Sequence, residues 1–203
     1  MELNTYPLVC TRGVVLYPNQ EIVIDVGRDN SVHAVENAQD NYDKKICLFS
    51  QKALEQENPA TEDIYSVGTL CEIRHIRRFD NFLRVKFRGI KRVKLNKWIN
   101  GSLSDLVEVE ILESEKQDTV EEEALIRMIA DELDRMQGQD RFVTKEIVME
   151  ISKGMGGEFL SDKAVQGLPL DLERKQKYLE TLGVNDRLMM LLQDMAKEKK
   201  MSE

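Results

Sequence analysis

Hydrophobic and polar residues alternate in short runs through the first half of the chain. Ile22, Ile24 and Val26 fall on one side of an extended backbone and Asp25 on the other, as expected for a half-buried strand. A series of such strands is predicted at residues 6–10, 14–17, 21–26, 46–49, 67–79, 82–89, 91–99 and 103–112. Many short strands with tight turns favour a small, closed or nearly closed β-barrel.

Two local signals add detail to this strand-rich half. Val32, Val35 and Ala38 recur at helical spacing, which predicts one early helix over residues 29–41. Pro18 followed by Asn19 predicts a turn, because proline fixes φ and asparagine tolerates the left-handed region.

The second half of the chain carries helical periodicity instead. Thr119 with Glu122 three residues later predicts a capping box for a first helix that ends at Gly138. Its expected core-facing residues are Leu125, Met128, Ile129, Leu133 and Met136. Further helices are predicted at 144–153, 158–165 and 171–182. A last helix is expected to be capped by Asn185, with an apolar stripe of Leu188, Leu191, Leu192 and Met195. The chain is therefore predicted to be α+β, with a β-rich domain at 1–117 and an α-helical bundle at 118–203.

Composition agrees with an ordinary globular protein of 203 residues, 41% of them hydrophobic, with a net charge of -8. No apolar run reaches the length of a membrane span, and the first residues lack the features of a signal peptide. A cytoplasmic protein without membrane contact is expected. The odd number of cysteines, Cys10, Cys47 and Cys71, agrees with that expectation, and each is predicted to be buried.

The chain contains none of the common catalytic motifs. It has no phosphate-binding G-x-x-x-x-G-K-[ST] loop and no G-x-S-x-G element. His33 and His75, together with three scattered cysteines, do not form a recognisable zinc pattern. We therefore expect a non-enzyme with no catalytic, cofactor-binding or metal-binding residue in these 203 positions.

A strip of basic residues between Arg74 and Lys97 is the main charge feature. Its proposed contact residues are Arg84, Lys86, Arg88, Arg92 and Lys94. One interpretation is cross-strand ion pairing with nearby acids on a solvated face. The alternative is weak DNA or RNA binding, with Phe79 and Phe82 stacking on bases.

Several segments resemble the N-terminal domain of Lon ATP-dependent proteases. In the first half these are Pro7-Leu8-Val9, then the run from Arg12-Gly13 to Tyr17-Pro18, and Val26-Gly27-Arg28. Val67-Gly68-Thr69 and Val85 leading to Gly89 resemble its central part. In the second half they are Leu168-Pro169-Leu170, Lys175-Gln176, Leu179-Glu180 and Arg187-Leu188 with Leu191-Leu192. One departure is Cys10-Thr11, where the family often carries Leu-Pro.

This resemblance implies a PUA-like β-barrel followed by a helical bundle. It implies a full-length homohexamer that hydrolyses ATP with Mg²⁺ and degrades misfolded and regulatory proteins with a Ser-Lys dyad, all in parts beyond Glu203. The region in hand would then bind unfolded or damaged protein substrates and support assembly. A stand-alone protein with a Lon-like barrel is the remaining alternative.

A substrate receptor needs an accessible apolar surface. The candidate residues for that surface are Leu16, Tyr17, Pro18, Phe79 and Phe82. For the first three, the reason is that the side chains of residues 14–18 cannot all face one core. The apolar stripe of the last helix is the candidate surface for contact with neighbouring subunits or with the missing domains.

Overall fold

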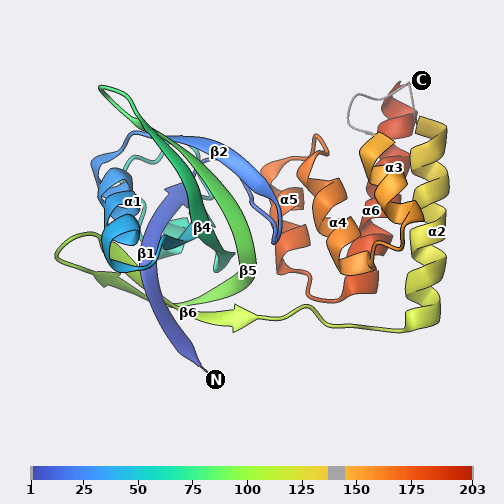
Figure 1. Cartoon of the computed structure of the whole chain (residues 1–203), viewed down its shortest axis with the longest axis horizontal. Helices are drawn as coiled ribbons and strands as arrows, with labels where there is room; N and C mark the ends of the chain where they lie inside the picture. Colours follow the sequence, from blue (N-terminus) through green and yellow to red (C-terminus); the bar gives the residue numbers. More distant parts are fainter. Residues whose placement is uncertain (1, 137–144, 203) are drawn as a thin grey trace. The chain divides into compact units, whose positions relative to one another are not determined.

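The computed structural model describes residues 2–136 and 145–202, which divide into two compact units, Met1–Glu113 and Ser114–Glu203. Unit 1 carries the strands and one α-helix, and unit 2 carries the other α-helices (Figure 1). The predicted helix end at Gly138 and the predicted start of the next helix at residue 144 lie outside the described residues.

Unit 1 is a six-stranded sheet with one α-helix. The strands are β1 (Leu3–Thr11), β2 (Glu21–Val26), β3 (Lys45–Ser50), β4 (Val67–Arg78), β5 (Leu83–Asn100) and β6 (Asp105–Leu112), with a 3-10 turn η1 at Thr61–Asp63. Their order is β2-β5-β4-β3-β1-β6, and an additional β5–β6 pairing closes a circuit of five strands. Only β1 and β3 pair in parallel. The early helix α1 (Asp29–Asn41) has the predicted bounds.

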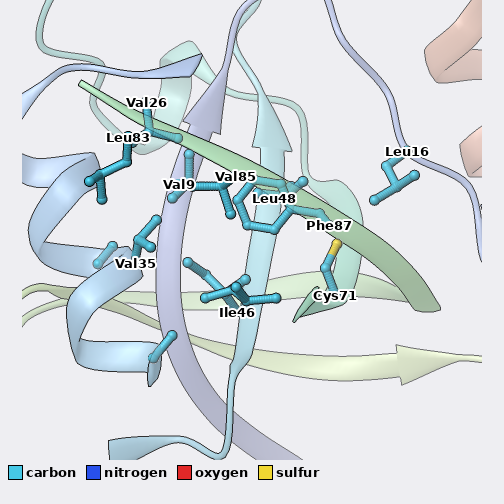
Figure 2. Packing of buried hydrophobic residues seen from close by; sticks show 13 residues of the cluster. Val9, Leu16, Val26, Val35, Ile46, Leu48, Cys71, Leu83, Val85 and Phe87 are labelled. Atoms are coloured by element: carbon cyan, nitrogen blue, oxygen red, sulfur yellow. The ribbon is translucent and has the colours of Figure 1, made fainter. Parts of the chain in front are cut away.

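Both faces of the central strands are buried, which explains the apolar run of β3. Ile46 and Leu48 point into a core shared with Val35 of α1 and with Val85 and Phe87 of β5 (Figure 2). The alternate side chains of β3, from Cys47 and Phe49, enter a second core with Leu8, Leu70, Val93, Val107 and Val109. Because successive side chains of a strand point to opposite faces, strands β1, β3, β4 and β5 each contribute to both cores.

Strand β5 is one continuous element where two strands were predicted, at 82–89 and 91–99. Its register slips near Gly89, where Leu70 pairs with Lys91 and Cys71 pairs with Gly89, so that Ile90 is an extra residue. Such a bulge bends a strand without ending it. It lets the first part of β5 face one core and Val93 face the other.

The predicted strand at 14–17 is wrong. Residues 14–18 are irregular and lead into the predicted Pro18-Asn19 turn, where Asn19 has a φ of 64°. Their backbone is held by side chains from three strands. The hydroxyls of Thr11 and Ser50 donate to the Val14 carbonyl at 3.0 and 2.7 Å, and Thr69 donates to the Leu16 carbonyl at 2.5 Å.

Unit 2 consists of five α-helices in the described residues. They are α2 (Thr119–Met136), α3 (Lys145–Ser152), α4 (Gly157–Gln166), α5 (Leu172–Glu180) and α6 (Val184–Ser202). Helix α6 packs against α2 and α4, and α2 also contacts α3. Their shared core is formed by Leu125, Ile129, Leu133, Leu160, Leu188, Leu191 and Met195.

Both predicted helix caps in unit 2 are wrong. Asp118, not Thr119, caps α2, because its carboxylate accepts the Glu121 amide at 2.7 Å. Glu122 instead accepts the Gly157 amide at the start of α4, at 3.0 Å. Asn185 lies inside α6 and its side-chain amide donates to the Asp118 carbonyl at 2.9 Å. The Asp118 cap is local, but the contacts that Glu122 and Asn185 make instead join residues far apart in the sequence, which local spacing does not reveal.

Candidate functional site

The first candidate substrate-binding segment, residues 16–18, is buried. Leu16 and Tyr17 are 2% and 1% exposed, and Pro18 is also buried. They cannot form an accessible apolar surface, so this part of the prediction is corrected. The physical reason is the irregular backbone of residues 14–18. A regular strand would point successive side chains to opposite faces, but here those of residues 16–18 all point inward. Leu16 joins the core shown in Figure 2.

The other two candidates, Phe79 and Phe82, lie at the tip of the β4–β5 hairpin, which extends beyond the rest of unit 1 (Figure 1, green). Their rings are stacked with centroids 4.6 Å apart. The Arg77 and Arg84 guanidinium groups lie 5.0 and 5.2 Å from the Phe79 ring centre, within cation–π range. Both phenylalanines are half-buried by these contacts. The tip remains a candidate surface, though a small one.

The cationic strip is mostly neutralised by acids of the neighbouring strand. Arg84 binds the Asp25 carboxylate through two bonds of 2.8 and 3.1 Å, and Lys86 and Arg88 lie 3.0 and 3.3 Å from Glu21. The hydrogen bond from Lys86 to Glu21 and that from Arg84 to Asp25 are the largest causes that lower the pKa values of the two carboxylates. These pairs are the predicted cross-strand pairing, with acids that come from β2, and Lys91 of the same strip pairs with Glu113 at 2.8 Å.

Arg92 does not belong to a surface strip. It is only 2% exposed, so it cannot contact a nucleic acid, and the prediction is wrong for this residue. The bulge near Gly89 shifts the alternation of β5, which turns Arg92 inward. Lys94 is exposed and lies opposite Glu110 of β6 in the register.

A groove between α2 and α6 is the apolar surface that the sequence interpretation missed. Met128 of α2 and Met189 of α6 are 56% and 43% exposed, although Met128 was predicted to face the core. With Leu192 and Ala196 they line a shallow groove of about 640 Å³ whose charged rim includes Glu132, Lys199 and Lys200. Lys199 and Glu132 are 3.8 Å apart across it. One signal of this groove was available in the sequence. Met189 directly follows the predicted stripe residue Leu188.

The predicted assembly stripe of the last helix is largely internal. Leu188, Leu191 and Met195 are at most 1% exposed and belong to the core of unit 2. Only Leu192 of the four is partly accessible, because it lines the groove. The stripe therefore stabilises its own unit, and the hypothesis that it serves neighbouring subunits is corrected.

Burial disfavours the reactive thiolate form of the three cysteines. Burial raises the pKa of Cys10 to about 12 and raises the pKa values of Cys47 and Cys71 well above the usual range. Within residues 2–136 and 145–202, no three His, Cys, Asp or Glu side chains are grouped so that they could hold a metal ion. The same residues include no helix long and apolar enough to cross a bilayer.

Comparison with solved structures defines the class of fold. The N-terminal domain of the Lon protease from the Mycobacterium avium complex superposes with a TM-score of 0.75 at 20% identity, covering 95% of this chain and 98% of that one. The Lon N-terminal domain protein from Xanthomonas campestris gives 0.63 at 18% identity, covering 93% and 97%. The chain has the mixed α+β fold of Lon N-terminal domains.

Sequence comparison then gives the family. Residues 5–197 match the family model of the ATP-dependent protease La (LON) substrate-binding domain, and the chain belongs to that family. It is 30% identical over 201 residues to Lon protease 1 of Bacillus subtilis, covering 98% of this chain and 26% of that protein. It is 33% identical over 206 residues to the Lon protease of Syntrophomonas wolfei, covering 100% and 25%. The chain thus spans about a quarter of the length of these relatives.

Proposed function

We propose that the chain is the substrate-capturing, non-catalytic part of an ATP-dependent Lon-type serine protease, and that it holds unfolded segments of client proteins in the α2–α6 groove. The observation that carries the proposal is that the exposed Met128 and Met189 both line one largely apolar groove. ATP hydrolysis with Mg²⁺ and peptide cleavage would belong to other parts of a longer cytoplasmic protein.

Methionine suits a receptor for many different sequences. Its unbranched, polarizable side chain adapts to ligands of varied shape. Burying one client side chain of leucine or phenylalanine size contributes about 1.5–3 kcal/mol. A groove of this size holds one or two such side chains, which gives weak and reversible binding. A capture site must release its client to the parts that degrade it, so weak binding is an advantage.

The charged rim favours client segments that carry both apolar and charged residues. Glu132 lies on one helix, and Lys199 and Lys200 on the other. An extended client backbone crossing the groove would meet both signs of charge. Surface charges steer encounter and contribute modestly to affinity, so the apolar contact decides whether binding occurs.

The finer description of the fold belongs to the same proposal. We infer that the closed circuit of β5, β4, β3, β1 and β6 is the PUA-like barrel and that unit 2 is a helical bundle. The division at 113/114 supports the predicted domains 1–117 and 118–203. Assembly into a homohexamer is proposed for the longer protein through surfaces other than the buried α6 stripe.

A binding assay with matched methionine variants tests the capture site. Fluorescently labelled, reduced and unfolded casein is titrated with the 203-residue chain, and anisotropy is measured. We expect Met128→Gln and Met189→Gln each to weaken binding about fivefold, because a polar side chain of similar length replaces an apolar one. Met149→Gln, at a site 57% exposed on α3, is the control and should bind as wild type. Equal effects of all three substitutions would refute the site.

Two alternatives remain predictions. Nucleic-acid binding through the cations that are still accessible, such as Lys94, is tested by a filter-binding titration with DNA and RNA at low ionic strength. A stand-alone protein with a Lon-like barrel is tested by reading the native gene downstream of codon 203.

A further inference from the structure

A second cavity lies in unit 1 where α1 begins. It has a volume of about 350 Å³ and is lined by residues of β1, β2, the following loops and the first turn of α1. Two of its residues are arginines from separate segments, Arg12 and Arg28. Burial, and then the nearby charge of Arg12, lower the pKa of Arg28, so two cations converge on one space.

Most hydrogen bonds of these two guanidinium groups go to neutral carbonyl oxygens. Arg28 donates to the carbonyls of Cys10 and Glu57 at 2.6 and 3.2 Å, and Arg12 to that of Gln56 at 3.3 Å. The carboxylate nearest to Arg12 is that of Glu57, at 3.5 Å, and its side chain is 75% exposed. Asp25 also lines the cavity, but its charge is already bound by Arg84. The positive charge is therefore held in place yet only weakly neutralised.

The first turn of α1 adds one hydroxyl to the same space. Ser31 in the first turn is only 8% exposed and lines the cavity. In the part of the chain that the structure describes, its hydroxyl has no hydrogen-bond partner. The hydroxyl can therefore donate a hydrogen bond to an acceptor that a ligand supplies.

The remaining walls are apolar. Val9 and Val26 are 3% exposed, and Val14 and Ile24 are half-buried. A fitting ligand therefore joins a compact oxyanion to an apolar group. The adjoining cavity, which shares Cys10, Arg28 and Ser31, contains Asp29 and Asp105 and would repel an anion. The anion is thus placed on the Arg12 side.

We propose that this cavity binds the free C-terminal carboxylate of a client polypeptide whose last side chain is apolar. The carboxylate would accept hydrogen bonds from Arg12, Arg28 and the Ser31 hydroxyl, and the side chain would lie against Val9, Val26 and Ile24. This inference rests on the proposed function, since it takes the ligand to be a client polypeptide. The protein would then have two sites for one client polypeptide. This cavity binds the end of the client, and the α2–α6 groove binds segments within it.

The test uses two labelled octapeptides that end in Ala-Leu and differ only in a C-terminal carboxylate or amide. Anisotropy with the 203-residue chain should show the acid binding about tenfold more tightly than the amide, because charge-assisted bonds to arginine are lost in the amide. Arg12→Gln and Ser31→Ala should each reduce that preference several-fold. Arg74→Gln removes an exposed cation of unit 1 outside the cavity and should leave it unchanged.

Each outcome has a defined meaning. Arg28 is not substituted because its bonds to two carbonyls support the fold, and circular dichroism melts confirm that the chosen variants are folded. Equal binding of acid and amide, or no effect of Arg12→Gln in a folded variant, overturns the inference. The inference is also overturned if inorganic phosphate binds, Arg12→Gln abolishes that binding, and the acid peptide does not bind. If casein still binds through Met128 and Met189 in those cases, only this inference fails. If casein does not bind either, the proposed function fails too.

Discussion

Substituting Gly89 with alanine tests the packing that removes residues 14–18 from the surface. A Cβ added at Gly89 would lie 2.3 Å from the Tyr17 carbonyl oxygen and 3.2 Å from the Pro18 Cα. Both are backbone atoms, so no rotamer change can relieve the clash. The two backbone bonds beside it, Asn19 N–H to Gly89 O and Gly89 N–H to Gln20 O, are each 2.9 Å and would lengthen.

The magnitude follows from these two effects. Overpacking a well-filled interior costs about 1–3 kcal/mol, and weakening backbone hydrogen bonds costs about 0.5–1.5 kcal/mol each. We expect Gly89→Ala to destabilise unit 1 by about 2–4 kcal/mol. With a urea dependence of about 1–3 kcal/mol per molar, the unfolding midpoint should fall by about 1–2 M.

The assay is urea unfolding followed by the fluorescence of Trp98, the only tryptophan of the chain, which lies on β5 in unit 1. Gly27→Ala is the control, because a Cβ there meets its nearest atom at 3.8 Å, an ordinary contact, and its midpoint should stay near that of wild type. A Gly89→Ala midpoint equal to that of Gly27→Ala would refute the placement of Tyr17 against β5 and reopen Leu16 and Tyr17 as surface candidates.

Three further outcomes are expected. Arg187→Ala should destabilise unit 2 by about 3–5 kcal/mol in circular dichroism melts. The fully buried guanidinium donates to the Thr181 carbonyl at 2.8 Å and lies 3.9 Å from the buried Asp162. A loss under about 1 kcal/mol would contradict that role. The folded pKa of Asp25 is lowered by the Arg84 hydrogen bond, so its stabilising effect is present above an unfolded pKa near ~3.9 and disappears as the pH falls through the folded value. Asp25→Asn should flatten the acid limb of the Trp98-monitored stability profile, and an unchanged limb would argue against the pair. Iodoacetamide at pH 7.5 should leave Cys10, Cys47 and Cys71 unmodified in the folded chain and label all three in denaturant, whereas rapid native labelling would show that burial is overestimated.

The regular elements could be predicted because their signals are local. Helix α1 follows from the spacing of Val32, Val35 and Ala38, and the Asn19 turn follows from the backbone preferences of Pro18 and Asn19. The hairpin turn between β4 and β5 also lies between the strands predicted at 67–79 and 82–89. In each case a few neighbouring residues determine the conformation.

The errors arose where distant residues decide the conformation. Gly89 suggested the end of a strand, but it is a point of close backbone approach from residues 17 and 18. Arg92 was predicted to lie on the surface from the regular alternation of side chains along β5. The bulge at Ile90 changes that alternation, and it arises from the pairing with β4, a distant segment. Met128 occupies a helical position that matches the core, yet it is 56% exposed and lines the groove beside α6. The proposed site therefore became visible only once two helices far apart in sequence were paired.

The most direct measurement is a methyl NMR titration of the chain labelled with ¹³C at its nine methionine methyl groups. Unfolded casein is added, and the signals are assigned by single substitutions. The account predicts saturable shifts or broadening of the Met128 and Met189 signals, with the exposed Met149 and Met201 signals unchanged. Equal perturbation of all four exposed methionines, or none at Met128 and Met189 while casein binds, would contradict the groove as the place where clients are held.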